Sequence, residues 1–181
     1  MIELIHGDCL EEMKKIKDKS VDMILCDLPY GTTACKWDTV ICFDLLWEQY
    51  KRIIKKNGAI VLFGQEPFAS YLRMSNIKMY KYDWIWHKSN PSNIALANKQ
   101  PMRYHEVICV FYKKQPLYNK QMIKRENRGV ATQQKSGKPF VNRTSDQTGL
   151  KEIQVNPNRY DKDWKNPSTI LKCPSLRPTS K

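Results

Sequence analysis

The fold is decided by the stretch Val21-Asp22-Met23-Ile24-Leu25-Cys26-Asp27-Leu28-Pro29-Tyr30. Its apolar run, residues 21–26, predicts a buried strand. A carboxylate, a proline-fixed backbone and an aromatic ring follow at the carboxyl end, where open α/β sheets bind their ligands. The four residues Asp27-Leu28-Pro29-Tyr30 therefore suit the binding of a planar ring that carries an amino group. A strand that simply runs into a Pro-Tyr turn fits the same residues.

Strand-like and helix-like segments alternate on both sides of this stretch. We expect further strands at residues 2–5, 59–63, 80–86 and 107–112. A short helix should begin at Asp8, which forms a capping-box pattern with Glu11. A second helix is expected over residues 44–56, with Asn57-Gly58 ending it, and a third over 67–75, with Pro67 at its first position. This alternation predicts an α/β domain with a mostly parallel sheet.

Size and composition favour one soluble intracellular domain. The 181 residues suit a single domain, with or without a subdomain, and no run of about 18 apolar residues is present. Residues 1–5 lack the basic and then apolar pattern of a secretory signal, so we expect a cytoplasmic protein. The six cysteines form no C-x-x-C pair, which favours free thiols in a reducing compartment and no zinc site.

Positive charge is concentrated in the second half of the chain. The net charge is +13, and residues 91–181 carry 18 Lys and Arg against 6 Asp and Glu. Such an asymmetry predicts a surface for phosphates. An anionic membrane or another acidic partner would fit the same charge, but no basic amphipathic helix stands out in this half.

The composition changes after Tyr112. Residues 113–172 are rich in Asn, Gln, Lys, Arg, Ser and Thr, which predicts a loop-rich basic region. A disordered tail is the alternative. Interspersed aromatic residues favour a region that folds alone or on DNA; they are Tyr118, Phe140, Tyr160 and Trp164.

Several motifs, in this order, resemble the DNA amino-methyltransferases, which methylate adenine N6 or cytosine N4. They are Gly7-Asp8-Cys9-Leu10, Ser20-Val21-Asp22, Asp27-Leu28-Pro29-Tyr30-Gly31, Trp37-Asp38, Asn57-Gly58, Leu62-Phe63-Gly64, Trp84-Ile85-Trp86-His87-Lys88 and His105-Glu106-Val107-Ile108. With the Asp-Pro-Pro-Tyr-like motif first and the recognition region after it, the order resembles the β group. The resemblance covers residues 1–112 well and implies a Rossmann-like sheet with helices on both faces.

The resemblance also implies roles for individual residues. Asp27 and the carbonyl of Leu28 would accept hydrogen bonds from the target amine, Pro29 would restrict Leu28 to extended conformations, and Tyr30 would stack on a base flipped out of the duplex. Leu28 stands where the family usually has proline. Asp rather than Ser at position 27 favours adenine over cytosine by analogy.

Other roles keep a structural alternative. Asp8 and Cys9 would contact S-adenosylmethionine, as would Lys181, but Asp8 also suits a plain helix cap. Trp86 would form a wall of the base pocket or pack on the sheet, and Lys88 would contact phosphate or end a strand in solvent. The further DNA contacts expected from the basic half are Lys113, Lys114, Lys124, Arg125 and Arg128.

The pattern breaks at the glycine-rich loop that the β group uses for its cofactor. The chain has seven glycines, and no two are spaced as G-x-G. Residues 176–181 resemble the segment that precedes this loop in the family, so we expect a chain truncated within its cofactor segment. The predicted organisation is a catalytic core at 1–112, a recognition region at 113–172 and the start of the cofactor segment at 173–181.

These observations favour a DNA adenine-N6 methyltransferase of the β group, incomplete at its S-adenosylmethionine site. The alternatives are an N4-cytosine enzyme, a catalytically dead remnant that binds DNA, and one subunit of a split enzyme. An incomplete sheet would expose a strand edge, so a complementary chain or self-association is expected.

Overall fold

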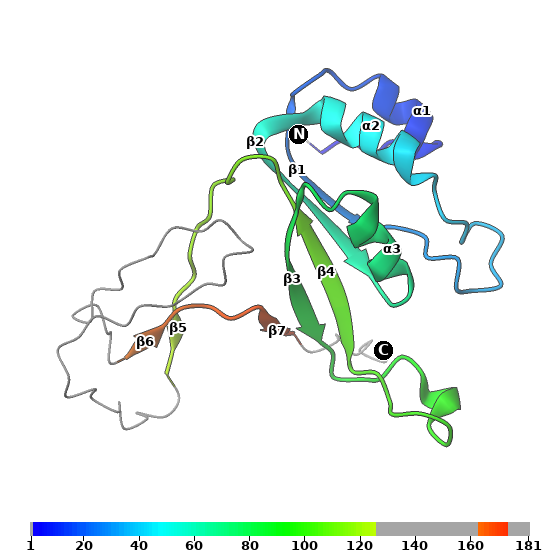
Figure 1. Cartoon of the computed structure of the whole chain (residues 1–181), viewed down its shortest axis with the longest axis vertical. Coiled ribbons are helices and arrows are strands. Elements are labelled where there is room, and N and C mark those ends of the chain that lie inside the picture. The colour runs from blue at the N-terminus through cyan, green and yellow to red at the C-terminus, as the bar shows by residue number, and fades with distance from the viewer. Residues whose placement is uncertain (1, 126–162, 174–181) are drawn as a thin grey trace. The chain divides into compact units, whose positions relative to one another are not determined.

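The computed structural model describes residues 2–125 and 163–173 (Figure 1). The chain divides into two compact units, Met1–Tyr118 with Ser168–Lys181, and Asn119–Pro167. In the described residues the second unit holds a small antiparallel pair of strands, β5 (Ile123–Lys124) and β6 (Trp164–Lys165). None of the described helices has the length and apolar character that a membrane crossing requires.

The first unit contains the elements that position the site. Its helices are α1 (Cys9–Lys14), α2 (Phe43–Ile53), α3 (Phe68–Ser75) and a short 3-10 helix, η1 (Ile94–Leu96). Its strands are β1 (Val21–Asp27), β2 (Ile54–Gly64), β3 (Tyr80–His87), β4 (His105–Phe111) and β7 (Ile170–Lys172). β7 lies in the range that the sequence assigned to the recognition region.

The five strands form one sheet in the order β1-β2-β4-β3-β7. β1 is parallel to β2 and β3 is parallel to β7, but β4 is antiparallel to both of its neighbours. The expectation of a mostly parallel sheet was therefore wrong for the pairings of β4 with β2 and β3. Residues 88–104 join β3 to β4 without an α-helix, and a loop of this kind is sufficient for antiparallel strands, whereas parallel ones need a crossover.

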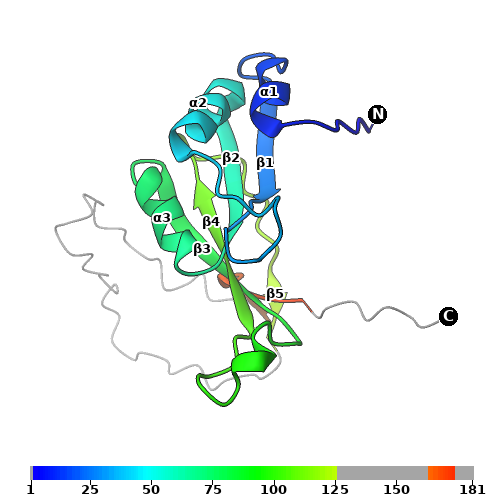
Figure 2. The same ribbon diagram turned by 90° about the vertical axis from the view of Figure 1, so that its right-hand side faces the viewer.

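One face of the sheet carries the hydrophobic core. Alternate residues of β2 and β4, such as Leu62 and Cys109, face α1, α2 and α3 and are fully buried. Figure 2 shows α2 and α3 along this face. The α-helices of the described residues all pack here, whereas the resemblance implied helices on both faces. The difference follows from β3 and β4, which are joined without a helix that could cover the second face.

Three local expectations from the sequence differ from the structure. Residues 2–5 form no strand. α2 ends at Ile53 and β2 begins at Ile54, four residues before Gly58. Gly58 does not end the helix; it lets two backbones approach, because an added Cβ would lie 2.8 Å from the carbonyl oxygen of Asp22. Pro67 is the N-cap of α3 rather than its first residue.

Candidate active site

The candidate site lies where the parallel strands β1 and β2 end. Asp27, the last residue of β1, pairs with Phe63, the next-to-last residue of β2. β3 runs in the same direction as β2, because both are antiparallel to β4. The segments that follow β1, β2 and β3 therefore start from one edge of the sheet, which is the ligand-binding edge of open α/β folds.

A hydrogen bond joins the two polar groups of the motif. The Tyr30 hydroxyl donates to Oδ1 of Asp27, which is exposed. Burial of Tyr30 raises the pKa of its phenol, and the bond to the Asp27 carboxylate raises that pKa further. The phenol therefore stays protonated at neutral pH and holds the carboxylate in one orientation, while the rest of the carboxylate remains accessible to a ligand.

Leu28 anchors the motif to the core. Its side chain is 6% exposed and belongs to the main hydrophobic cluster. A proline at this position would fix the backbone through its ring; the leucine instead fixes it through apolar burial, which contributes about 1.5–3 kcal/mol for a side chain of this size. Pro29 follows and favours an extended conformation at Leu28.

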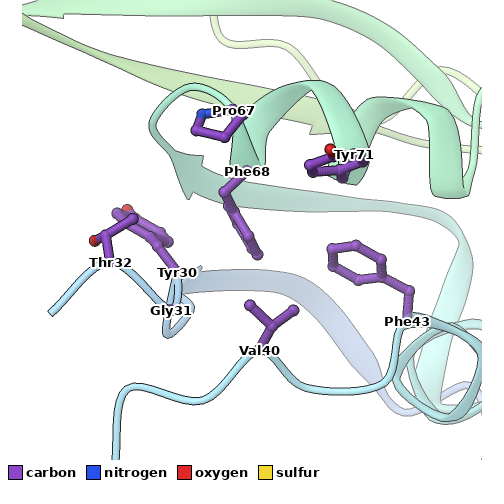
Figure 3. Close-up of a pocket in the computed structure, with 8 residues that line it drawn as sticks. All are labelled: Tyr30, Gly31, Thr32, Val40, Phe43, Pro67, Phe68 and Tyr71. Atoms are coloured by element: carbon purple, nitrogen blue, oxygen red, sulfur yellow. The ribbon is translucent and has the colours of Figure 1, made fainter. Parts of the chain in front are cut away.

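An aromatic pocket opens beside Tyr30 (Figure 3). Its volume is about 380 Å³, within the range of small-molecule sites. The rings of Tyr30 and Phe68 have centroids 4.9 Å apart with 34° between their planes, and the Phe43 ring lies 5.7 Å beyond that of Phe68. The lining residues are Tyr30, Gly31, Thr32, Val40, Phe43, Pro67, Phe68 and Tyr71. Such a lining suits a flat, apolar-faced ring.

The loop after Tyr30 is closed by a carboxylate. Gly31 has a φ of 69°, and the amides of Gly31, Thr32 and Thr33 donate to the side chain of Asp38 at 2.7–2.9 Å. A side-chain hydrogen bond from Thr33 and the backbone bond from Gly31 lower the pKa of Asp38 to about 2. Asp38 is therefore ionised at neutral pH and fixes the turn that forms one wall of the pocket.

An ion pair lies at the same end of the sheet, where β3 ends and β4 begins. Nζ of Lys88 lies 2.5 Å from Oε1 of Glu106, and their side chains are only 13% and 23% exposed. The pair holds Lys88 against the protein, so its ammonium does not project freely into solvent. Glu106 also contributes to the raised pKa of Tyr30.

Trp86 packs against the sheet and does not line the pocket. Its ring lies edge-on to Phe63, with centroids 6.2 Å apart, and its indole N–H donates to the carbonyl oxygen of Cys173 at 3.2 Å. In the register of the strands, Phe63 and Trp86 share the face of Asp27 and Glu106. This is the face opposite to the three helices.

Asp8 acts as the N-cap of α1. Its carboxylate accepts hydrogen bonds from the amides of Leu10 at 2.9 Å and Glu11 at 3.3 Å. The capping box is only half formed, because Glu11 pairs with Lys14 instead of returning to Asp8. Cys9, the first residue of the helix, is exposed, and the pKa of its thiol is raised by partial burial and by Asp8.

The remaining predicted residues belong to the basic half. Lys113, Lys114 and Lys124 are exposed, and Nε of Arg125 donates to the carbonyl oxygen of Trp164 at 3.2 Å. Arg128 and Lys181 lie outside the described residues. Of the predicted residues, the structure brings Asp27, Leu28, Pro29 and Tyr30 together.

Sequence reasoning assigned no role to four residues of the site. Phe43, Phe68 and Asp38 shape the pocket and its loop, and Glu106 holds Lys88. Asp38 and Glu106 belong to the motifs Trp37-Asp38 and His105-Glu106, which the sequence analysis did recognise. The place of these motifs in the ordered set could therefore have indicated the two residues. The two phenylalanines carry no such signal, because only the packing of α2 and α3 brings them to Tyr30.

Comparisons with known proteins show which proteins the chain resembles. No protein-family model matches the chain. It is 28% identical over 114 residues to the type II methyltransferase M.HinfI of Haemophilus influenzae, covering 49% of this chain and 32% of that protein. It is also 28% identical over 121 residues to the DNA adenine methyltransferase YhdJ of Escherichia coli (strain K12), covering 61% and 40%.

A solved structure extends the agreement to the fold. The cytosine-N4-specific PvuII DNA methyltransferase superimposes with a TM-score of 0.56 at 11% identity, covering 97% of this chain and 58% of that one. The chain spans only about a third to two fifths of the curated relatives that it matches. The chain is therefore similar in sequence to two curated methyltransferases and shares its fold with a solved DNA methyltransferase.

Proposed function

We propose that the chain acts in methyl transfer from S-adenosylmethionine to adenine N6 in double-stranded DNA, and that it supplies the grip on the base. The observation that carries this proposal is the Tyr30–Asp27 hydrogen bond at a parallel-strand end, beside an aromatic pocket. The names of the two curated relatives, a type II methyltransferase and a DNA adenine methyltransferase, support DNA as the substrate.

The chemical difficulty is a poor nucleophile, because the lone pair of an exocyclic amine is delocalised into its ring. Asp27 would accept one hydrogen bond from this amine and the Leu28 carbonyl a second, which favours a pyramidal nitrogen with a localised lone pair. Tyr30 would stack on a base flipped out of the duplex, a contact worth roughly 1–3 kcal/mol. The contribution of these residues is positioning, without a covalent enzyme intermediate.

The 181 residues lack one element that the resembled family uses for its cofactor. S-adenosylmethionine supplies an electrophilic methyl group when it is bound, and its backbone contacts need glycine at a strand-to-helix turn. The sequence has no G-x-G, and Oδ1 of Asp8 accepts the hydrogen bonds that cap α1. We therefore infer that further polypeptide, continuous with these residues or supplied by a partner chain, carries the glycine turn.

DNA would be bound mainly by the exposed lysines of the basic half, including Lys113, Lys114 and Lys124. Lys88 is a weaker choice for a phosphate contact, because its ammonium is paired with Glu106. Sequence-independent phosphate contacts of this kind make affinity fall steeply with salt.

The test is radiolabelled methyl transfer to DNA by the chain supplemented with polypeptide that carries the glycine turn, with the modified nucleoside identified by mass spectrometry. Asp27→Ala should abolish transfer. Asp22→Ala is the matched control, because it removes an exposed aspartate of the same strand, whose carboxylate pairs with Lys55 on the surface. N6-methyladenine supports the proposal, and equal transfer by both variants refutes it. Calorimetric binding of S-adenosylmethionine by the chain alone at micromolar affinity would refute the incomplete cofactor site.

Two alternative functions are each supported by a specific observation. The fold shared with a cytosine-N4-specific enzyme favours N4-cytosine methylation as the second candidate, and N4-methylcytosine as the product would establish it. A catalytically dead DNA-binding remnant is favoured by the +13 charge and the absent glycine loop. DNA binding that is equal in Asp27→Ala and the unaltered chain, with no transfer even beside a complementary polypeptide, would indicate this remnant.

A further inference from the structure

We propose that Lys88 binds the flipped adenine directly, by donating a hydrogen bond from its ammonium to a ring nitrogen of the base. Glu106 is a positioning residue that holds this ammonium at the site. This inference rests on the proposed function and adds to it the contact that reads the ring of the base rather than its amine. The place of the Lys88–Glu106 ion pair, its burial and its unused donors support the assignment.

The ion pair lies on the same face and at the same end of the sheet as Asp27. Asp27 pairs with Phe63 of β2, and Phe63 pairs with Ile108 of β4. Glu106 precedes Ile108 by two residues, so its side chain lies on the same face, further toward the end where β1 and β2 finish. Lys88 directly follows β3 at this end and donates to Glu106. Asp27 and the ion pair therefore lie on the two sides of β2, at its carboxyl end.

The charge of Glu106 also acts on the residue that would stack on the base. Burial and the neighbouring Asp27 raise the pKa of the Tyr30 phenol most, and Glu106 raises it further. The interaction of two charges falls with distance, so Glu106 lies in the vicinity of the phenol. A base with its amine on Asp27 and its face on Tyr30 would thus lie beside the carboxylate to which Lys88 is bonded.

The burial of the pair is poorly explained by stability alone. The side chains of Lys88 and Glu106 are 13% and 23% exposed, whereas the lysines of three surface pairs, Lys14, Lys15 and Lys55, are 40–71% exposed. Removing two charges from water carries a large desolvation penalty, and their mutual attraction often does no more than offset it. Shielded charges beside a ligand-binding edge are typical of functional sites.

The ammonium of Lys88 has donors to spare. An ammonium carries three N–H donors and no acceptor. Among the described residues, the partner of this ammonium is Glu106, which accepts one hydrogen bond. The low exposure of the side chain leaves little water to satisfy the other donors. The ring nitrogens of adenine are acceptors, so they complement these donors as Asp27 complements the amine, and a charged donor makes such a bond stronger than a neutral one.

A ring nitrogen suits this ammonium better than a phosphate does. A neutral acceptor can bind a spare donor while Glu106 stays in place. A phosphate would bring a second anion beside the shielded carboxylate, where like charges repel strongly. The exposed lysines of the basic half meet no such carboxylate and are better suited to the DNA backbone, as Lys113 and Lys114 illustrate.

The experiment measures binding of the full chain to short duplexes that carry one unpaired adenine opposite an abasic site, so that flipping the base costs little. The duplexes differ only at that position, which holds adenine, its 1-deaza, 3-deaza or 7-deaza analogue, or a second abasic site. Each analogue replaces one ring nitrogen with C–H and keeps the exocyclic amine. We expect one analogue to bind about tenfold more weakly than adenine, as the loss of one charge-assisted hydrogen bond predicts.

Substitutions at the ion pair then identify the donor. Lys88→Met should remove the preference, so that adenine and the affected analogue bind equally. The double variant Lys88→Met/Glu106→Gln leaves no unpaired charge behind and should give the same result, which separates a contact with the base from misfolding. Glu106→Gln alone should keep part of the preference, because the donor remains while its orientation is loosened. Lys55→Met is the matched control and should keep the whole preference, since Lys55 pairs with Asp22 on the surface.

The outcomes separate the Lys88 contact from the proposed function. If the unaltered chain binds adenine no more tightly than a second abasic site, the grip on the base is refuted and the contact with it. If adenine is preferred but all analogues bind equally well, or Lys88→Met keeps the preference, the contact alone is overturned. An equal loss of affinity for every duplex in Lys88→Met, with a salt dependence lower by about one ion, would overturn it in favour of a phosphate contact. Circular dichroism confirms that each variant is folded.

Discussion

Replacing Gly31 with alanine should lower the free energy of unfolding by about 1–2 kcal/mol. The residue has a φ of 69°, and a side chain in this left-handed region costs roughly that amount. A second, smaller contribution comes from contact, because the added Cβ would lie 3.1 Å from Cγ2 of Val40. That methyl group belongs to an exposed side chain, which can move by a few tenths of an ångström.

Urea unfolding followed by tryptophan fluorescence measures the effect. With a slope of about 2 kcal/mol per molar urea, the midpoint should fall by about 0.5–1 M. Gly31→Asn adds the same Cβ but tolerates a positive φ better, so it should cost less than alanine. Thr32→Ala, at the next residue of the loop, is the control. Equal midpoints for alanine and glycine, or a larger loss with asparagine, would refute the assignment of the cost to backbone strain.

Three further predictions concern charged and polar groups of the site. The pKa of Asp38 is lowered from 3.8 to about 2, so the stability that its carboxylate contributes is complete above pH 3.8 and is lost as the pH falls through 2. The free energies of unfolding of the unaltered chain and of Asp38→Asn should therefore converge as the pH is lowered over that range. Lys88→Met should lower the free energy of unfolding, measured by thermal unfolding, by about 1–3 kcal/mol, because it leaves the largely buried Glu106 carboxylate without its cation. Adding Glu106→Gln to this variant should restore at least half of the loss. The raised pKa of Tyr30 predicts that Tyr30→Phe leaves the ultraviolet phenolate titration through pH 10 unchanged, and that the unaltered chain loses more stability than this variant as the pH rises above 10.

The sequence predicted the elements whose periodicity is strong. β1, α2 and β3 lie within a few residues of their expected ranges, because each has an apolar pattern that its own neighbours in sequence determine. The junction between α2 and β2 was not predictable in this way. Asn57-Gly58 has the sequence of a helix end, and only the close approach to Asp22 shows why glycine stands there.

The antiparallel direction of β4 could not be predicted from its own residues either. A buried strand has the same apolar run whether it is parallel or antiparallel, so only the length and character of the connection from β3 distinguish the two cases. The polar part of the site could be predicted because Asp27 and Tyr30 are three residues apart in one motif. The pocket could not, since Phe43 and Phe68 reach Tyr30 only through tertiary packing.

The carboxylate of Asp38 has a consequence for how tightly the pocket could bind. Three amides that would otherwise need a ligand or water are already satisfied by the protein, so the loop is held in one shape before a ligand enters the pocket. Ordering a flexible side chain or loop on binding costs roughly 0.5–1.5 kcal/mol for each immobilised group. Here that conformational entropy is lost during folding, so it would not reduce the binding free energy of a ligand in the pocket.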